Sequence, residues 1–231
     1  MKAVILAHAR AEYPRESCGL ILNIDGMASY RPCKNIAERQ CDFIMDPVDY
    51  MKAEDEAQII AIVHSHCDVS PKPSPADLVG CERSGLPWHI VSVPQGTWAY
   101  LEPSGYVAPL IGRPYSIGVL DCYSLIQDFY MDEFRQKLPD FERSEMWWKK
   151  GQNLYMDHFK EAGFEEVDGP MMRGDIIIMQ IGSKVPNHAA VYLLEKNWML
   201  HHLMNRLSAR EIYGGYWQKV TRLVVRSKLR E

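Results

Sequence analysis

The 231-residue sequence has no long hydrophobic segment. Apolar runs such as 59–63 and 176–179 are only four or five residues long, whereas a membrane-spanning helix needs about 20. The apolar stretch at the N-terminus meets His8 and Arg10 too early to form the core of a signal peptide, which needs about 7–15 apolar residues. We therefore expect a protein without a membrane span or export signal, located in the cytoplasm.

An excess of basic residues is also missing. Lys and Arg total 26 against 30 Asp and Glu, so the net charge is −4. This balance disfavours a nucleic-acid-binding protein, which is usually basic. The hydrophobic fraction of 47% and the charged fraction of 24% are ordinary for globular proteins and exclude disorder as the main state. The length allows one large domain or two small ones.

The six cysteines contain no C-x-x-C pair, so the common structural zinc spacings are absent. In a reducing compartment we expect free thiols that serve mainly as small apolar side chains. Cys122 is the sole cysteine of the second half of the chain. We interpret four of the others as packing residues, namely Cys18, Cys33, Cys41 and Cys81.

A segment rich in proline and glycine, residues 102–109, predicts a stiff joint, because it cannot sustain a helix or a central strand. We therefore divide the chain into domains at 1–105 and 106–231. In the second domain helices precede strands, which favours an α+β fold. The expected helices are 47–58, 121–137 and, more weakly, 151–162. The expected strands are 20–24, 59–63, 88–93, 175–180, 188–194, 198–203 and 220–226.

The densest group of reactive side chains in the first domain is the H-x-H pair His64 and His66. Residues at i and i+2 of a strand project to the same face, and Asp77 can add a carboxylate. Two histidines and one carboxylate, with a fourth position open, are typical of catalytic zinc. By itself an H-x-H pair near a strand end is more often a pair of surface residues, so the surrounding segment must decide.

The run His64-Ser65-His66, followed by Ser74 and Asp77, resembles the JAMM motif of the MPN metallopeptidases, which reads H-[ST]-H-P and then S-x-x-D. Residues 14–20 also match the upstream glutamate element of that family. The resemblance covers about residues 1–100 and implies an MPN-like α/β domain with one bound Zn²⁺.

The same resemblance implies roles for single residues. The zinc ligands would be His64, His66 and Asp77. Glu16 would be the general acid/base that acts on the metal-bound water, and Ser74 would stabilise the oxyanion. Where the family usually has proline after the second histidine, this chain has Cys67. We expect Cys67 to lie in the following loop without a role.

Cys122 follows Asp121 at the predicted start of a helix, where backbone amides lower the pKa of a thiol. A nucleophile needs a base, and His188 precedes the apolar run 189–193. His201 and His202 are both candidates for the group that orients this base. Neighbouring strand residues point to opposite faces, so only one of them can serve. A single cysteine on a helix is otherwise a core residue.

In order along the chain, the runs 121–126, 174–178 and 188–192 resemble the motifs of the NlpC/P60 cysteine peptidases. The resemblance spans about residues 112–205 and implies a papain-like α+β domain. It implies Cys122 as nucleophile, His188 as base and His201, whose spacing fits slightly better than that of His202, as the orienting residue. Ser124 replaces a usual glycine, and Tyr115 only loosely matches an upstream tyrosine of the family.

A JAMM half followed by an NlpC/P60 half resembles the tail-tip assembly proteins of lambda-like tailed phages. The resemblance implies a bifunctional zinc- and thiol-dependent peptidase that hydrolyses peptide or isopeptide bonds during tail-tip assembly in the host cytoplasm. Its partners would be tail-tip proteins, with peptidoglycan peptides as a second class of substrate. Two alternatives stay open: a non-catalytic assembly scaffold or chaperone, and a peptidoglycan endopeptidase carried in the virion for entry.

Overall fold

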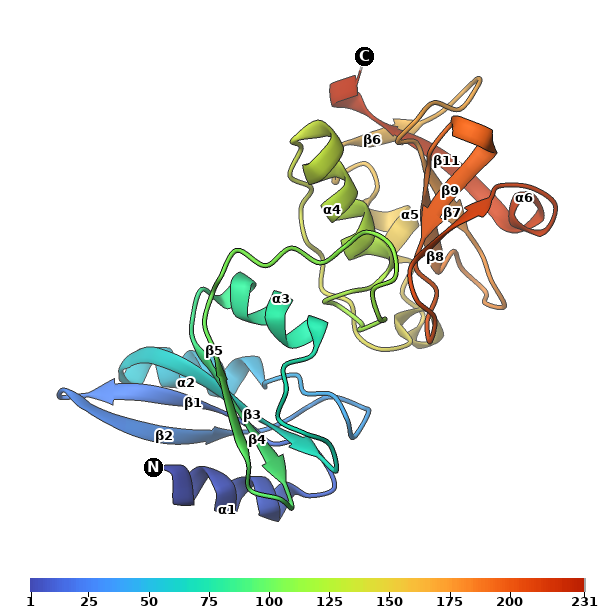
Figure 1. The fold of residues 1–231 in the computed structure, drawn as a ribbon. Helices are drawn as coiled ribbons and strands as arrows, with labels where there is room; N and C mark the ends of the chain where they lie inside the picture. Colours follow the sequence, from blue (N-terminus) through green and yellow to red (C-terminus); the bar gives the residue numbers. More distant parts are fainter. Residues whose placement is uncertain (231) are drawn as a thin grey trace. The chain divides into compact units, whose positions relative to one another are not determined.

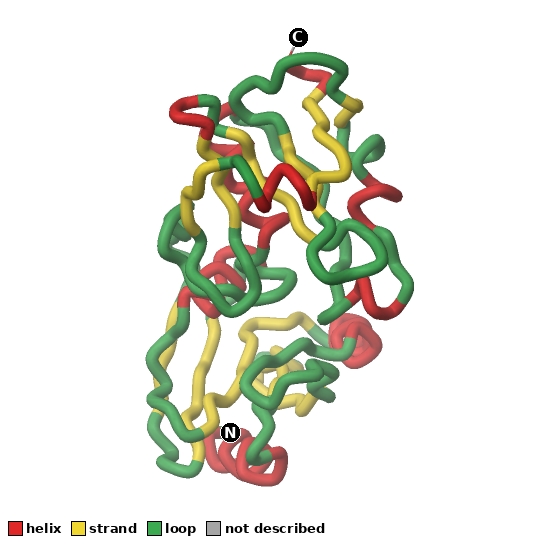
Figure 2. The backbone as a smooth tube through the Cα atoms, turned by 90° about the vertical axis from the view of Figure 1, so that its right-hand side faces the viewer, coloured by secondary structure: helices red, strands yellow, loops and turns green. Residues whose placement is uncertain are grey.

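The computed structural model describes residues 1–230 and separates into two compact units, residues 1–107 and 108–231 (Figure 1). Each unit combines one β-sheet with helices and loops (Figure 2). This architecture confirms the predicted class, a two-domain fold of mixed helices and strands. Over residues 1–230, no helix has both the length and the apolar character that a bilayer crossing requires.

The first unit contains a five-stranded sheet in which β3 lies at the centre, antiparallel to β1 and parallel to β4. The strand order is β2-β1-β3-β4-β5. The elements are α1 (Lys2–Glu12), β1 (Cys18–Ile24), β2 (Met27–Cys33), α2 (Pro47–Glu56), β3 (Gln58–Cys67), α3 (Pro75–Ser84), β4 (Trp88–Val93) and β5 (Trp98–Leu101).

Helices cover both faces of this sheet. One face buries Ala61 and Val63 of β3 in a cluster with α1. The other buries Ile62 in a cluster with α2 and α3. Because successive side chains of a strand alternate between faces, His64 and His66 share the face of Ile62. Both histidines therefore point to the side on which α3 lies.

The predicted helix over 47–58 is present as α2, and the Asp46 side chain caps it by accepting a hydrogen bond from the amide of Val48. The strand predicted over 59–63 was too short, because β1 pairs with β3 as far as His64 and β4 pairs with it as far as Cys67. Helix α3 was not predicted, although Ser74 and the proline after it carry the same start signal as Asp46 and its proline.

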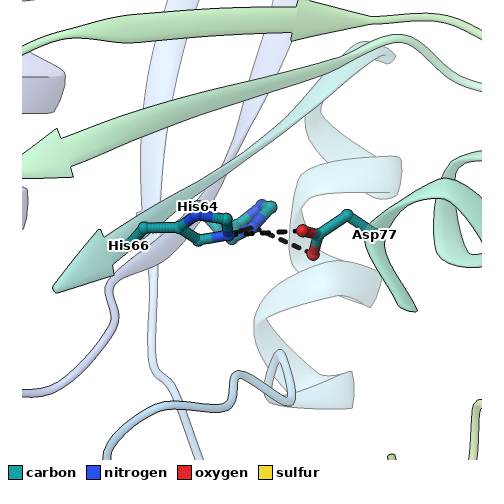
Figure 3. A group of neighbouring side chains, drawn as sticks. All are labelled: His64, His66 and Asp77. Atoms are coloured by element: carbon teal, nitrogen blue, oxygen red, sulfur yellow. Dashed lines mark hydrogen bonds and ion pairs between the residues drawn. The ribbon is translucent and has the colours of Figure 1, made fainter. Parts of the chain in front are cut away.

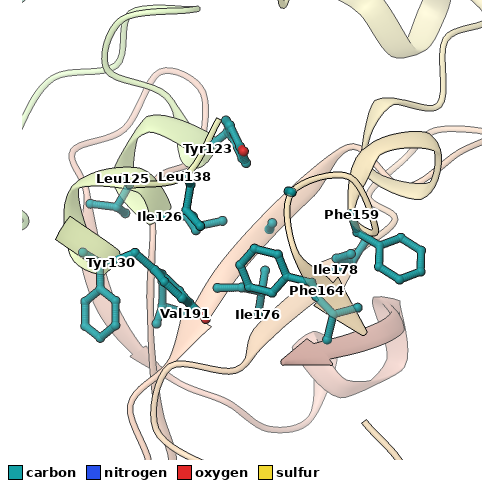
Figure 4. Close-up of a cluster of buried hydrophobic side chains, with 14 of the residues drawn as sticks. Tyr123, Leu125, Ile126, Tyr130, Leu138, Phe159, Phe164, Ile176, Ile178 and Val191 are labelled. Carbon is teal, nitrogen blue, oxygen red and sulfur yellow. The ribbon is translucent and has the colours of Figure 1, made fainter. Parts of the chain in front are cut away.

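The second unit contains a six-stranded sheet in the order β10-β9-β8-β7-β11-β6. Helix α4 packs on this sheet, and its apolar side chains meet those of β7 and β8 in a buried cluster (Figure 4). The helices are α4 (Cys122–Phe134), α5 (Leu154–His158) and α6 (Tyr216–Val220). The strands are β6 (Phe164–Glu166), β7 (Ile176–Met179), β8 (His188–Tyr192), β9 (Trp198–His201), β10 (Ala209–Ile212) and β11 (Thr221–Ser227). Short 3₁₀ turns lie at Trp147–Lys150, Glu195–Asn197 and Lys228–Arg230.

The helix predicted over 121–137 ends earlier, at Phe134, because Arg135 adopts a left-handed backbone conformation with φ of 54°. The helix predicted over 151–162 is reduced to the five residues of α5. Strands β7, β8, β9 and β11 lie within the predicted segments or one residue beyond them. The short edge strands β6 and β10 were missed; β6 pairs with the distant strand β11, whereas β10 pairs with the preceding strand β9.

The cysteines correct two expectations. Cys41 is exposed rather than packed, whereas Cys18, Cys33 and Cys81 are buried as expected. Cys67 is the last residue of β3 and does not lie in the following loop. Its Sγ is 3.3 Å from the carbonyl oxygen of Arg15, to which it donates a hydrogen bond. All six are free thiols.

Candidate metal centre and thiol site

The first site lies where β3 faces the start of α3 (Figure 3). The Nε2 atoms of His64 and His66 are 3.2 Å apart. Asp77 reaches them from α3, with Oδ1 3.2 Å from Nε2 of His64 and Oδ2 3.3 Å from Nε2 of His66. All three side chains are buried. The structure thus brings together the three residues predicted as metal ligands.

The donor atoms fit a zinc ion. Tetrahedral zinc with ligands at 2.0–2.1 Å places those ligand atoms about 3.3 Å from one another. The separations between the histidines and Asp77 match this value. Nδ1 of His66 lies 3.0 Å from the carbonyl oxygen of Ser70. A proton on Nδ1 donates there and leaves the lone pair of Nε2 directed into the cluster, as in known metal-binding histidines.

Helix α3 holds Asp77 in place through a capping box with Ser74. The amide of Ser74 donates to Oδ2 of Asp77 at 2.7 Å, and the amide of Asp77 donates to Oγ of Ser74 at 3.1 Å. Burial alone would raise the pKa of Asp77, but its contacts with His64 and His66 and the hydrogen bond from the Ser74 amide hold it well below its usual range. In this structure Oγ of Ser74, the predicted oxyanion group, accepts from the amide of Asp77, while the amide of Ser74 orients the Asp77 carboxylate.

Aromatic side chains fix the ring of His64. Phe43 stacks on it with ring centroids 4.5 Å apart, and Trp88 packs edge-on at 5.4 Å. This burial lowers the pKa of His64. The ring is therefore neutral at neutral pH, which is the form that binds metal ions.

Glu16 is brought to the cluster by the pairing of β1 with β3. Cys18 pairs with His64, and the amide of Ser65 donates to the carbonyl oxygen of Ser17 at 3.0 Å. One step further along these antiparallel strands, Glu16 lies beside His66. Burial raises the pKa of Glu16 to about 8, although His66 opposes this shift. A cation at the cluster would favour the carboxylate. Glu16 can therefore exchange a proton near neutral pH, as a general acid/base must.

The second site begins at the N-terminus of α4. Asp121 caps this helix by accepting a hydrogen bond from the amide of Ser124 at 2.8 Å. Its carboxylate is fully buried and also accepts from Nε of Arg143 at 2.9 Å. This cap holds Cys122 as the first residue of α4. The half-buried thiol has Sγ 3.1 Å from the hydroxyl oxygen of Tyr155.

A chain of hydrogen bonds fixes the histidines. Nε2 of His201 is 3.3 Å from Oε1 of Glu211, and Nδ1 of His201 is 3.1 Å from Nε2 of His188. Because the carboxylate can only accept, a neutral His201 carries its proton on Nε2 and accepts at Nδ1. His188 must then carry its proton on Nε2, which leaves Nδ1 free to take another. Nε2 of His202 lies instead 3.1 Å from the carbonyl oxygen of Arg206.

Cys122 and His188 line one pocket of about 230 Å³. His202, Tyr115 and Arg206 also line it, so the loosely matched Tyr115 does lie at the thiol site. His201 stands behind His188 and contacts it directly. The structure thus gathers the predicted nucleophile, base and orienting residue in the second unit.

The electrostatics of the thiol differ from the expectation based on its helix position. Burial, aided by the charge of Asp121, raises the pKa of Cys122 to about 11 and outweighs the lowering by Tyr155, the Ala189 amide and Arg143. Burial also lowers the pKa of His188 to about 3. Both groups are therefore neutral at pH 7. Near neutral pH a thiolate would require transfer of its proton to His188, where the two opposite charges stabilise each other.

Alkylation of Cys122 is expected to be slow at pH 7 and to accelerate toward a midpoint at about pH 11. The thiolate is the reactive form, and a raised pKa leaves the neutral thiol dominant below the midpoint. The rate should therefore rise about tenfold per pH unit over this range. Mass spectrometry of the Cys122 peptide after timed iodoacetamide treatment measures it. A rate that levels off below neutral pH would contradict the prediction.

Two residues of the thiol site were missed from the sequence. Tyr155 lies in the segment predicted only as a weak helix, and Glu211 lies in the unpredicted strand β10. Neither belongs to a recognisable motif. Tyr155 is brought to the site by packing between distant segments, and Glu211 by the pairing of β10 with β9. Phe43, which stacks on His64, was also missed, because only the fold brings its segment against β3.

Comparisons with known proteins match the two parts of the chain to two different families. The family model for prokaryotic homologs of the JAB domain matches residues 1–101, and that for the NlpC/P60 family matches residues 112–226. The tail tip assembly protein K of Escherichia phage N15 is 43% identical over 227 residues, which covers 97% of this chain and 93% of that protein.

Two further relatives are more distant. The tail tip assembly protein K of Escherichia phage lambda is 39% identical over 178 residues, covering 77% of this chain and 86% of that protein. A desampylase of Pyrococcus furiosus is 32% identical over 83 residues, covering 33% of this chain and 59% of that protein.

Proposed function

Because the chain belongs to the family of the phage tail tip assembly proteins K, we propose that it is a bifunctional peptidase of a tailed phage that acts in tail-tip assembly. Its JAB/MPN-like first unit would hydrolyse peptide or isopeptide bonds with zinc, and its NlpC/P60 second unit would do so with a thiol. The observation that carries the proposal is that each unit gathers a full set of catalytic residue types from separate elements.

In the first unit, His64, His66 and Asp77 would hold the zinc ion. When bound, zinc would polarise the scissile carbonyl and acidify water at the open position. Glu16 would take a proton from the attacking water as the water oxygen bonds to the carbonyl carbon. Glu16 would then pass that proton to the leaving amine as the C–N bond breaks. Ser74 would keep Asp77 oriented during these steps.

In the second unit, Nδ1 of His188 would take the proton of Cys122 while the sulfur bonds to the carbonyl carbon. As the C–N bond breaks, His188 would pass that proton to the leaving amine. Water would then attack the thioester with His188 again as base, and His188 would return that proton to the sulfur as the C–S bond breaks. His201 holds the ring of His188, and Glu211 holds His201, so that one nitrogen stays available as acceptor.

We propose tail-tip proteins in the host cytoplasm as the main substrates and partners, because that is where a phage tail would be assembled. Peptidoglycan peptides are the second class of substrate, to be tested on the thiol site. The shared fold alone does not select between them, since one fold serves many substrates.

Complementation of a phage whose own copy of the gene is inactivated tests the proposal. Wild type and the control Cys41→Ala, which alters an exposed thiol far along the chain from the catalytic cysteine, should restore plaques. Cys122→Ala and Glu16→Ala, tested separately, should each lose most of the plaque yield and leave an uncleaved tail protein, because each lacks a group that moves the proton or forms the covalent bond.

The same experiment separates the alternatives. Full yield from both variants, with no change in any tail protein, would support a non-catalytic scaffold and reject the peptidase proposal. Normal tails that contain the protein, together with thiol-dependent cleavage of cell walls, would support an endopeptidase used at entry.

A further inference from the structure

Tyr155 lies against the thiol although no motif points to it. Its hydroxyl oxygen is 3.1 Å from Sγ of Cys122. Its ring lines an apolar cavity of about 50 Å³ and packs against Trp147 with centroids 5.9 Å apart and planes at 64°. The ring is thus held by apolar contacts, while the hydroxyl at its end meets the sulfur.

The direction of this hydrogen bond follows from the charges. Burial, together with Cys122, raises the pKa of Tyr155 well above its ordinary value, so the hydroxyl keeps its proton. Against a neutral thiol either group can donate. Against a thiolate only the hydroxyl can donate, and hydrogen bonds to a charged acceptor are shorter and about twice as strong. The contact therefore favours the thiolate over the thiol.

The surroundings of the thiol leave a need for such a donor. The buried carboxylate of Asp121 opposes the thiolate, and Arg143 only partly offsets it because it is paired with that carboxylate at 2.9 Å. The amide of Ala189 is a further favourable contact. The other titratable or charged side chains that line the pocket with the thiol are Tyr115, His188, His202 and Arg206.

We propose that Tyr155 is a further catalytic residue of the thiol site, whose hydroxyl donates a hydrogen bond to the Cys122 sulfur and stabilises the thiolate while His188 holds the proton. No bond to Tyr155 forms or breaks, and its own proton stays on the hydroxyl oxygen. The role in catalysis rests on the proposed function of the second unit, whereas the effect on the thiolate does not.

The test compares Tyr155→Phe with Tyr123→Phe in the full-length protein. Tyr123 is a matched control, because its ring lines the same apolar cavity but its hydroxyl donates to the carbonyl oxygen of Pro139, at 2.8 Å. Phenylalanine keeps the ring in both cases. Iodoacetamide alkylation of Cys122 at a fixed pH below the thiol midpoint should slow about tenfold in Tyr155→Phe, which corresponds to a rise of about one pKa unit. In the control it should change less than about twofold.

Peptide cleavage gives the second readout. In Tyr155→Phe we expect kcat to fall about tenfold or more with KM changed less than about twofold, since the lost hydrogen bond acts after substrate binding. Unchanged alkylation and kcat in Tyr155→Phe would overturn the inference while the loss of activity in Cys122→Ala still upheld the peptidase. If Tyr155→Phe were alkylated more slowly than the wild type, but the wild type cleaved no peptide, the thiolate contact would be upheld and the peptidase proposal rejected.

Discussion

Cys122→Ala is expected to abolish thiol-dependent hydrolysis by the second unit, with a loss of roughly 10⁴-fold or more in kcat/KM. The sulfur is the atom that would form the bond to the substrate carbonyl, and alanine leaves His188 without a proton to accept. The fold should survive, because the capping box of α4 uses the side chains of Asp121 and Ser124 rather than the thiol. Release of products from a murein peptide and from isolated tail-tip proteins measures the effect.

Cys41→Ala is the control for general effects of losing a thiol, since Cys41 is exposed. It should retain wild-type rates on both substrates. If Cys122→Ala cleaved either substrate at the wild-type rate, Cys122 would have no part in that reaction. A fall in cleavage for only one of the two substrates would identify the class on which the thiol site acts.

Double replacement of His64 and His66 with alanine is expected to reduce bound zinc from about one ion per chain to none. The change removes two of three donor groups, and a single carboxylate does not hold zinc in a structural or catalytic site. It also deprives buried Asp77 of both histidine contacts, which were 3.2 and 3.3 Å long. Metal analysis after dialysis measures the zinc content, and thermal unfolding measures the stability.

Two further variants keep this prediction testable. His89→Ala removes a half-buried histidine of β4 that lies outside the cluster, and it should retain zinc. Asp77→Asn keeps the size of the side chain and should lose most of the zinc while remaining folded. A folded wild-type protein that binds no zinc when zinc is supplied would contradict the proposed metal centre.

Local sequence was enough to indicate much of the fold and of both sites. The period of two in a strand placed His64 and His66 on one face, and the cap signals of Asp46 and Asp121 predicted two helix starts. These signals act within a few residues, so they are present in the linear sequence. The motif resemblances then supplied candidate roles for distant residues such as Glu16, but not their surroundings.

The surroundings depend on long-range pairing and packing. The register of β1 against β3 brings Glu16 beside His66, and the pairing of β8, β9 and β10 selects His201 rather than His202 as the partner of His188. Packing in the second unit likewise brings Tyr155 to Cys122, where burial raises the pKa of the thiol instead of the helix amides lowering it. Spacing along the chain specifies which side chains share a face, whereas desolvation and contacts between distant segments exist only after the chain has folded.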